Sequence, residues 1–135
     1  MKVLPIVFVV DDDPIIVDSL RAVLAAQGHV VRCFHSAEEF LAQLSSNAVG
    51  CVLIDLILPG INGNSLWRRL VATDSLLSVI ILTGWIESLD LTWQKTPTGA
   101  VLEKPYDISV LTSLITDGID QSLKKKSERD RGRMR

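Results

Sequence analysis

Polar side chains follow four apolar runs of this sequence, and their types suit a site that holds a phosphate group and a metal ion. Asp11 and Asp12 follow the run IVFVV, Asp55 follows CVLI, Thr83 follows VIIL, and Lys104 comes shortly after AVL. Carboxylates bind divalent cations, and ammonium groups bind phosphate oxygens. This set of groups is suited to an aspartate that becomes phosphorylated.

The apolar runs themselves are typical of strands in a buried parallel sheet. Their apolar residues are consecutive rather than alternating, as expected where helices cover both faces of the sheet. In open parallel sheets, ligands bind beyond the carboxyl ends of the strands. Since all four polar termini fall at that edge, we expect their side chains to converge in space.

Convergence of three carboxylates predicts a divalent cation. Two carboxylates about 5 Å apart repel by roughly 3 kcal/mol at an effective dielectric constant near 20, and Asp11, Asp12 and Asp55 would form several such pairs. Mg²⁺ is favoured over Zn²⁺ because no His or Cys lies at ligand spacing near these carboxylates. The competing interpretation, solvated aspartates that cap a helix, suits Asp13 before Pro14.

The wider pattern predicts five strands that alternate with five helices. Strands are expected at 6–10, 30–34, 51–54, 79–82 and 100–103, and helices at 14–27, 37–45, 64–72, 86–94 and 107–123. Ser36 and Glu39 are typical of a capping box, and Gly28 suits a helix end. Right-handed crossovers then predict an α/β fold, a flavodoxin-like five-stranded parallel sheet of order 2-1-3-4-5 with helices on both faces.

Length and composition predict one domain with no membrane span. The chain has 135 residues, of which 47% are hydrophobic and 22% charged, which is enough to bury one core. It has no run of 18 apolar residues and no signal-peptide pattern, so we expect a cytoplasmic protein. Cys33 and Cys51 fall in or beside predicted strands, and we interpret them as core residues rather than redox partners.

Charge is distributed unevenly along the chain. Residues 1–123 carry seven Lys or Arg and fourteen Asp or Glu, whereas residues 124–135 carry seven and two. The basic segment has almost no apolar side chains with which to fold, so we expect a folded domain over 1–123 and a disordered tail or linker over 124–135. Because basic runs are usually solvated, we expect no direct nucleic-acid binding by these residues.

The chain resembles a two-component response-regulator receiver domain, closest in pattern to FixJ-like receivers, over residues 6 to about 123. The resemblance rests on four motifs in order, VVDDD at 9–13, IDLILPGING at 54–63, ILTG at 81–84 and EKPY at 103–106. It implies a phosphorylation switch in two-component signal transduction. Such a domain is not an enzyme for an external substrate, since it catalyses only its own phosphorylation and slow autodephosphorylation.

The same resemblance implies how a phosphoryl group would be held. Asp55 would accept the group from a sensor histidine kinase or a phosphotransfer protein. Thr83 would donate a hydrogen bond to a phosphoryl oxygen, and Lys104 would pair first with Asp55 and then with the phosphate. A cis Lys104–Pro105 peptide bond is also implied.

The resemblance implies a Mg²⁺ site beside the phosphoacceptor. Its ligands would be the Asp12 and Asp55 carboxylates and the backbone carbonyl of Ile57, with Asp11 acting mainly through a coordinated water.

An enzyme of the phosphatase class is an alternative to a receiver. Phosphatases that use an aspartyl nucleophile typically carry a second acid two residues after it. Ile57 occupies that position here, which disfavours a phosphatase.

Departures from the family pattern cluster late in the chain. Val101 stands at the usual position of an aromatic switch residue, and Thr83 lies 21 residues before Lys104, where 22 is commoner. Residues 83–100, TGWIESLDLTWQKTPTGA, match the usual fourth helix poorly, with Trp85, Trp93 and Pro97 atypical. A pseudo-receiver that acts as a constitutive interaction module therefore stays open. A second copy of the chain is a candidate partner through the face of the fourth helix, fifth strand and fifth helix.

Overall fold

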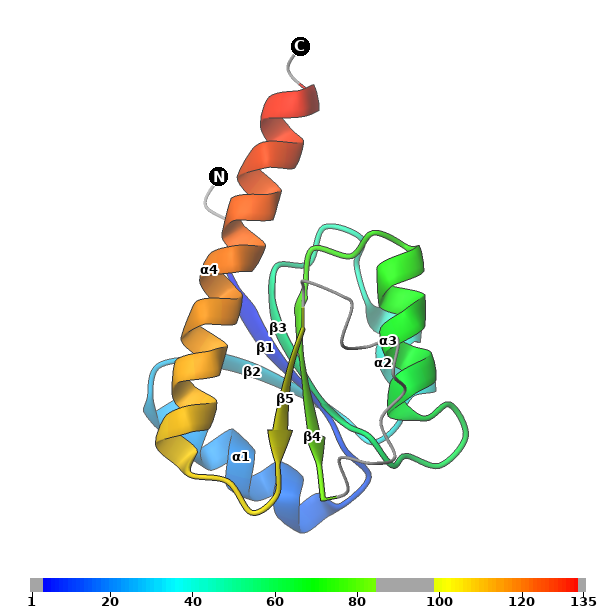
Figure 1. Ribbon diagram of the computed structural model, residues 1–135, viewed down its shortest axis with the longest axis vertical. Coiled ribbons are helices and arrows are strands. Elements are labelled where there is room, and N and C mark those ends of the chain that lie inside the picture. The colour runs from blue at the N-terminus through cyan, green and yellow to red at the C-terminus, as the bar shows by residue number, and fades with distance from the viewer. Residues whose placement is uncertain (1–3, 85–98, 134–135) are drawn as a thin grey trace.

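The fold is a layer of parallel strands between two layers of helices (Figure 1). The computed structural model describes residues 4–84 and 99–133. The elements there are β1 (Ile6–Val10), α1 (Pro14–Ala26), β2 (Val30–Phe34), α2 (Ala37–Gln43), β3 (Gly50–Asp55), α3 (Gly63–Ala72), β4 (Ser78–Thr83), β5 (Gly99–Glu103) and α4 (Ile108–Arg133). The helix expected at 86–94 lies outside the described residues, so α4 corresponds to the fifth expected helix.

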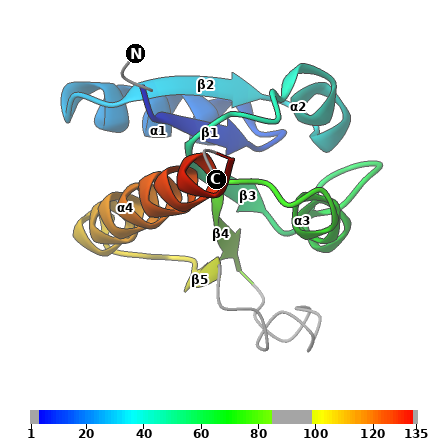
Figure 2. The same ribbon diagram turned by 90° about the horizontal axis from the view of Figure 1, so that it is seen from above.

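The sheet has the strand order β2-β1-β3-β4-β5, and every neighbouring pair is parallel. At the carboxyl ends, Val10 pairs with Phe34 on one side and Ile54 on the other, and Ile54 pairs with Ile81. Helices α1 and α4 cover one face and α2 and α3 cover the other (Figure 2). The predicted α/β fold and strand order are therefore confirmed.

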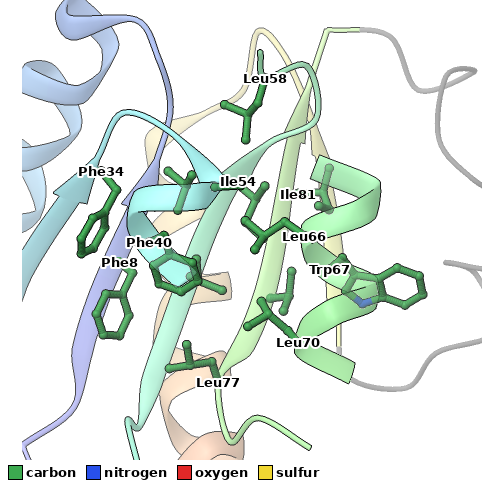
Figure 3. Packing of buried hydrophobic residues seen from close by; sticks show 14 of the residues in the cluster. Phe8, Phe34, Phe40, Ile54, Leu58, Leu66, Trp67, Leu70, Leu77 and Ile81 are labelled. Atoms are coloured by element: carbon green, nitrogen blue, oxygen red, sulfur yellow. The ribbon is translucent and has the colours of Figure 1, made fainter. Parts of the chain in front are cut away.

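Each face of the sheet has its own buried core because successive residues of a strand point to opposite faces. Under α2 and α3, Phe8 packs with Phe34 and Phe40, and the ring centroids of Phe8 and Phe40 are 5.4 Å apart (Figure 3). On the other face, Val7 and Val9 pack against α1 and α4. A strand buried on both sides must be apolar at consecutive positions, which explains the runs in the sequence.

Helices α1 and α2 begin at side chains that accept backbone N–H groups. Asp13 Oδ1 accepts from the N–H of Ile15 at 3.0 Å, and Ser36 Oγ accepts from the N–H of Glu39 at 3.1 Å. The reciprocal bond of the expected capping box is displaced by one residue, because the Glu39 carboxylate accepts from the N–H of His35 at 3.2 Å. Both helix starts are thus set by local sequence.

Helix α4 lies close to the sheet because small residues face β3 and β4. Ser78 Oγ donates to the carbonyl of Gly118 at 2.5 Å, and the N–H of Gly50 donates to Ser122 Oγ at 2.9 Å. A Cβ atom added at Gly118 would lie 3.1 Å from Ser78 Cβ. These contacts fix the distance between the helix and the strands.

The carboxyl-terminal part of α4 continues past the sheet, on the side opposite the strand ends that carry the polar residues (Figure 1). Residues 124–133 are helical, where we expected a disordered tail or linker. Lys126 Nζ pairs with Asp130 Oδ2 at 2.7 Å one turn away, and Arg129 Nη2 donates to the carbonyl of Asp74 at 2.7 Å. Although α4 has 26 residues, neither it nor another described helix is long and apolar enough to cross a membrane.

The contact of Arg129 with Asp74 is expected to hold the end of α4 against the turn after α3. In an Arg129→Ala variant, trypsin should cleave after Lys124, Lys125 and Lys126 about twofold to fivefold faster, in keeping with the small energies of exposed ion pairs. Cleavage rates report the population of the opened helix when opening is fast. An Arg131→Ala variant changes an exposed arginine of the same helix and is the control. Equal rates in the two variants would contradict the prediction.

Candidate functional site

The carboxyl ends of β1, β3, β4 and β5 bring the predicted polar residues to one edge of the sheet. Asp11 and Asp12 follow β1 directly, Asp55 and Thr83 are the last residues of β3 and β4, and Lys104 follows β5. Since β1, β3, β4 and β5 are neighbours in that order, these residues lie side by side along the edge. The sequence placed all five at this edge correctly.

Three carboxylates meet within this edge. One oxygen from each of Asp11, Asp12 and Asp55 lies within 4.8 Å of the others. Asp11 is buried, Asp55 is partly buried and Asp12 is exposed. At such separations like charges repel by a few kcal/mol at an effective dielectric constant near 20. A positive charge among these oxygens would relieve that repulsion.

Asp11 has a buried oxygen that is available to a water bound to a cation. Its Oδ1 accepts from the N–H of Asp13 at 2.9 Å, whereas its buried Oδ2 has no hydrogen-bond partner among the described residues. Burial raises the pKa of Asp11, the Asp13 hydrogen bond opposes this, and the negative charge of Asp55 adds to the increase. A buried carboxylate oxygen without a partner and an all-oxygen donor set fit a hard cation such as Mg²⁺.

Lys104 supplies positive charge on the other side of Asp55. Its Nζ lies 3.7 Å from Asp55 Oδ2, and its backbone N–H donates to the carbonyl of Thr83 at 2.7 Å. The Thr83 side chain is buried at the end of β4. The Lys104–Pro105 peptide bond is cis, as the resemblance implied. Lys104 is therefore tied to the neighbouring strand while its ammonium faces Asp55.

The loop after Asp55 is closed tightly on itself. The N–H of Ile57 donates to Asp55 Oδ1 at 3.1 Å, and the N–H of Gly63 donates to the carbonyl of Leu56 at 3.0 Å. A Cβ at Gly63 would lie 2.7 Å from Leu56 Cα, so a larger residue does not fit there. Leu56 and Leu58 are buried, and the Ile57 side chain between them is 64% exposed. The backbone of Ile57 is thus held beside the Asp55 carboxylate.

Two residues near the site were not identified from the sequence. Tyr106 is partly buried, and burial together with the Asp11 charge raises the pKa of its hydroxyl. Glu38 of α2 contacts the loop after β3 through the N–H of Ile61 at 2.8 Å. Tyr106 adjoins the Lys-Pro motif, which was a usable signal, but nothing in the sequence links Glu38 to a residue 23 positions away.

The departures from the family pattern are only partly described by the structure. Val101, at the usual position of an aromatic residue, is partly buried and packs against the core under α2 and α3. Trp85, Trp93 and Pro97 lie outside the described residues. That these three residues alter the usual fourth helix stays a prediction.

The two cysteines differ in burial. Cys51 is fully buried in the core between β3 and the α1 and α4 layer, and burial raises the pKa of its thiol to about 12. Cys33 is partly buried and packs at the margin of the same core. Because a thiol with such a high pKa stays protonated at neutral pH, Cys51 acts as a small core residue.

Comparison with known proteins identifies similar chains. The family model described as the response regulator receiver domain matches residues 7–116. The transcriptional regulatory protein FixJ of Bradyrhizobium diazoefficiens is 36% identical over 118 residues, which cover 86% of this chain and 57% of that protein. The DNA-binding transcriptional regulator NtrC of Salmonella typhimurium is 32% identical over 127 residues, which cover 93% of this chain and 27% of that protein.

Solved structures of response regulators also superpose on this chain. The response regulator StyR superposes with a TM-score of 0.89 at 28% identity, covering 97% of this chain and 67% of that one. Full-length FixJ from B. japonicum gives a TM-score of 0.76 at 33% identity, covering 90% of this chain and 60% of that one. The chain therefore spans little more than half the length of FixJ, and what the whole of such a protein does is not carried over by the match.

Proposed function

The chain belongs to the response-regulator receiver family of two-component signalling, and we therefore propose that Asp55 is its phosphoacceptor. The observation that carries the proposal is the arrangement around Asp55. Its carboxylate has Asp11 and Asp12 within 4.8 Å and the Lys104 ammonium 3.7 Å away. A carboxylate with candidate cation ligands and an ammonium both close to it is suited to receive a phosphoryl group.

In the proposed reaction, a carboxylate oxygen of Asp55 attacks the phosphorus atom of a phosphohistidine. The new O–P bond forms as the N–P bond breaks, and the imidazole leaves with the bonding electron pair and takes up a proton from water. An ionised carboxylate needs no general base, so charge neutralisation and in-line positioning are the main requirements. The Lys104 ammonium contributes charge, and the Thr83 hydroxyl donates a hydrogen bond to a phosphoryl oxygen.

The residues proposed to hold Mg²⁺ are the Asp12 and Asp55 carboxylates and the Ile57 carbonyl, with Asp11 acting mainly through a coordinated water. The orphaned Oδ2 atom of Asp11 and the all-oxygen donor set support this assignment. When bound, Mg²⁺ supplies positive charge that offsets the carboxylates and the incoming phosphoryl group. The acidic cluster also favours a phosphorylated switch over a constitutive interaction module. A constitutive module needs no cation or phosphate, so the repulsion among its three carboxylates would only destabilise it.

The proposal is tested by incubating the chain with acetyl phosphate and Mg²⁺. We expect intact-mass spectrometry to find one added phosphoryl group, located at Asp55 by peptide mapping. With excess EDTA the added mass should be absent, because the carboxylate cluster is then without its counter-charge. Modification that is unchanged by EDTA, or that maps to another residue, would contradict the proposal.

We further propose the setting in which this switch works. The phosphoryl donor is a sensor histidine kinase or a phosphotransfer protein in the cytoplasm, and the chain catalyses no reaction beyond its own phosphorylation and dephosphorylation. We also propose that the receiver domain ends at residue 123, although helix α4 continues across that position to Arg133. A homodimer through the face of the fourth helix expected at 86–94, β5 and α4 is the proposed assembly, with no direct contact to nucleic acid or membrane by these residues.

A further inference from the structure

Glu38 connects α2 to the loop that joins β3 to α3. It is an exposed residue in the first turn of α2, and its Oε1 accepts from the N–H of Ile61 at 2.8 Å. A Cβ atom added at Gly60 would lie 2.7 Å from the same oxygen. The carboxylate is therefore in contact with the backbone at the tip of the loop, 23 residues away along the chain.

This loop carries the backbone beside the phosphoacceptor. Its base is closed by the bond from the Gly63 N–H to the Leu56 carbonyl, and Leu58 anchors it in the core. Its tip is exposed from Pro59 to Gly60, and Gly60 has a positive φ of 72°. Ordering the backbone of one residue costs about 1–2 kcal/mol, so an exposed tip needs contacts from outside the loop to stay in one conformation.

We propose that Glu38 is a positioning residue, which holds the loop of residues 56–62 in the conformation that presents Asp55 and the Ile57 carbonyl to a cation. The inference rests on the proposed function. Glu38 does not touch the cation or the phosphoryl group. It acts through the Ile61 N–H, and it makes the loop ready before the cation binds, so that less of the binding free energy is spent on ordering it.

The charge state of Glu38 suits this role. The hydrogen bond from the Ile61 N–H lowers the pKa of the Glu38 carboxyl, and the positive charge of Arg69 acts in the same direction. The carboxylate is therefore ionised at neutral pH. Hydrogen bonds to ionised acceptors are stronger than those between neutral groups.

The test compares Glu38→Ala with Glu38→Gln in the full chain by NMR. Both variants remove the same charge, but the amide oxygen of glutamine can still accept from the Ile61 N–H. A Glu128→Ala variant removes an exposed carboxylate from α4 and is the control. In each protein we would measure the hydrogen-exchange rate of the Ile61 amide without metal and the dissociation constant for Mg²⁺.

We expect Glu38→Ala to speed exchange of the Ile61 amide, and to raise the dissociation constant for Mg²⁺, each by about threefold to tenfold, the range for loss of one hydrogen bond. Glu38→Gln should show smaller losses in both measurements, because its amide oxygen still accepts the Ile61 N–H but lacks the charge that strengthens the bond. An unchanged dissociation constant in Glu38→Ala, or equal losses in the alanine and glutamine variants, would overturn the inference. If the parent chain binds no Mg²⁺, the proposed function fails and this inference fails with it.

Discussion

Replacing Asp55 with asparagine is expected to abolish the gain of one phosphoryl group from acetyl phosphate. The amide oxygen of asparagine can still accept the N–H of Ile57, which bonds to Asp55 Oδ1 at 3.1 Å, so the loop should keep its shape. What the variant lacks is an ionised nucleophile, since a neutral amide oxygen attacks phosphorus poorly. Intact-mass spectrometry after timed incubation with acetyl phosphate and Mg²⁺ measures the difference.

An Asp117→Asn variant is the matched control for this substitution. Asp117 is an exposed carboxylate on α4, and its replacement should leave the phosphoryl gain at the parent level. A beryllofluoride complex, followed by the chemical shifts of the residues around Asp55, should form with the parent and the control and not with Asp55→Asn. A full phosphoryl gain in Asp55→Asn would rule out Asp55 as the acceptor.

The sheet and the position of the site were predictable because both depend on strands buried on two faces. Burial on two faces leaves long apolar runs, and the first polar residue after such a run marks the strand end. Asp55 and Thr83 each follow such a run directly, and Lys104 follows the last run after one intervening residue. The parallel order of the strands then brings these ends to one edge.

The sequence did not distinguish the surroundings of Asp11 from those of Asp12. In the structure, the N–H of Asp11 donates to the carbonyl of Phe34 at 3.1 Å, so the pairing of β1 with β2 continues one residue past β1. The side chain of Asp11 is buried as a result, and Asp12 is exposed. Strand ends are set by such single hydrogen bonds, which a hydrophobic pattern does not encode.

The length of α4 and the loop contact of Glu38 depend on contacts between distant residues. Arg129 reaches Asp74 across 55 residues, and composition alone indicated a solvated basic tail there. Lys126 and Asp130 at helical spacing were a local signal for helix that the net charge outweighed in the sequence interpretation. Glu38 binds a backbone N–H, a group that every residue except proline offers, so no partner side chain could indicate it.

The Asp11→Asn substitution is expected to stabilise the metal-free protein while weakening its binding of Mg²⁺. Asparagine keeps an oxygen that accepts the N–H of Asp13, and it removes one charge from the cluster with Asp12 and Asp55. We expect the free energy of unfolding in urea at pH 7 without metal to rise by about 1–3 kcal/mol, the size of one or two carboxylate repulsions at an effective dielectric constant near 20. Saturating Mg²⁺ should reverse the order, because stabilisation by a bound ligand grows with the logarithm of the ratio of its concentration to its dissociation constant, and the parent binds Mg²⁺ more tightly.

The pH dependence of this stabilisation follows from the raised pKa of Asp11 in the folded protein. Between the ordinary Asp pKa of about 3.9 and the raised folded value, the folded state binds more protons than the unfolded state, so the contribution of Asp11 to stability falls as pH rises. The advantage of Asp11→Asn over the parent should therefore be largest above the folded pKa of Asp11 and shrink as pH falls through it. An Asp117→Asn control, exposed on α4, should show no such trend. If Asp11→Asn is less stable than the parent at pH 7 without metal, mutual repulsion does not dominate the cluster, and its need for a cation is unsupported.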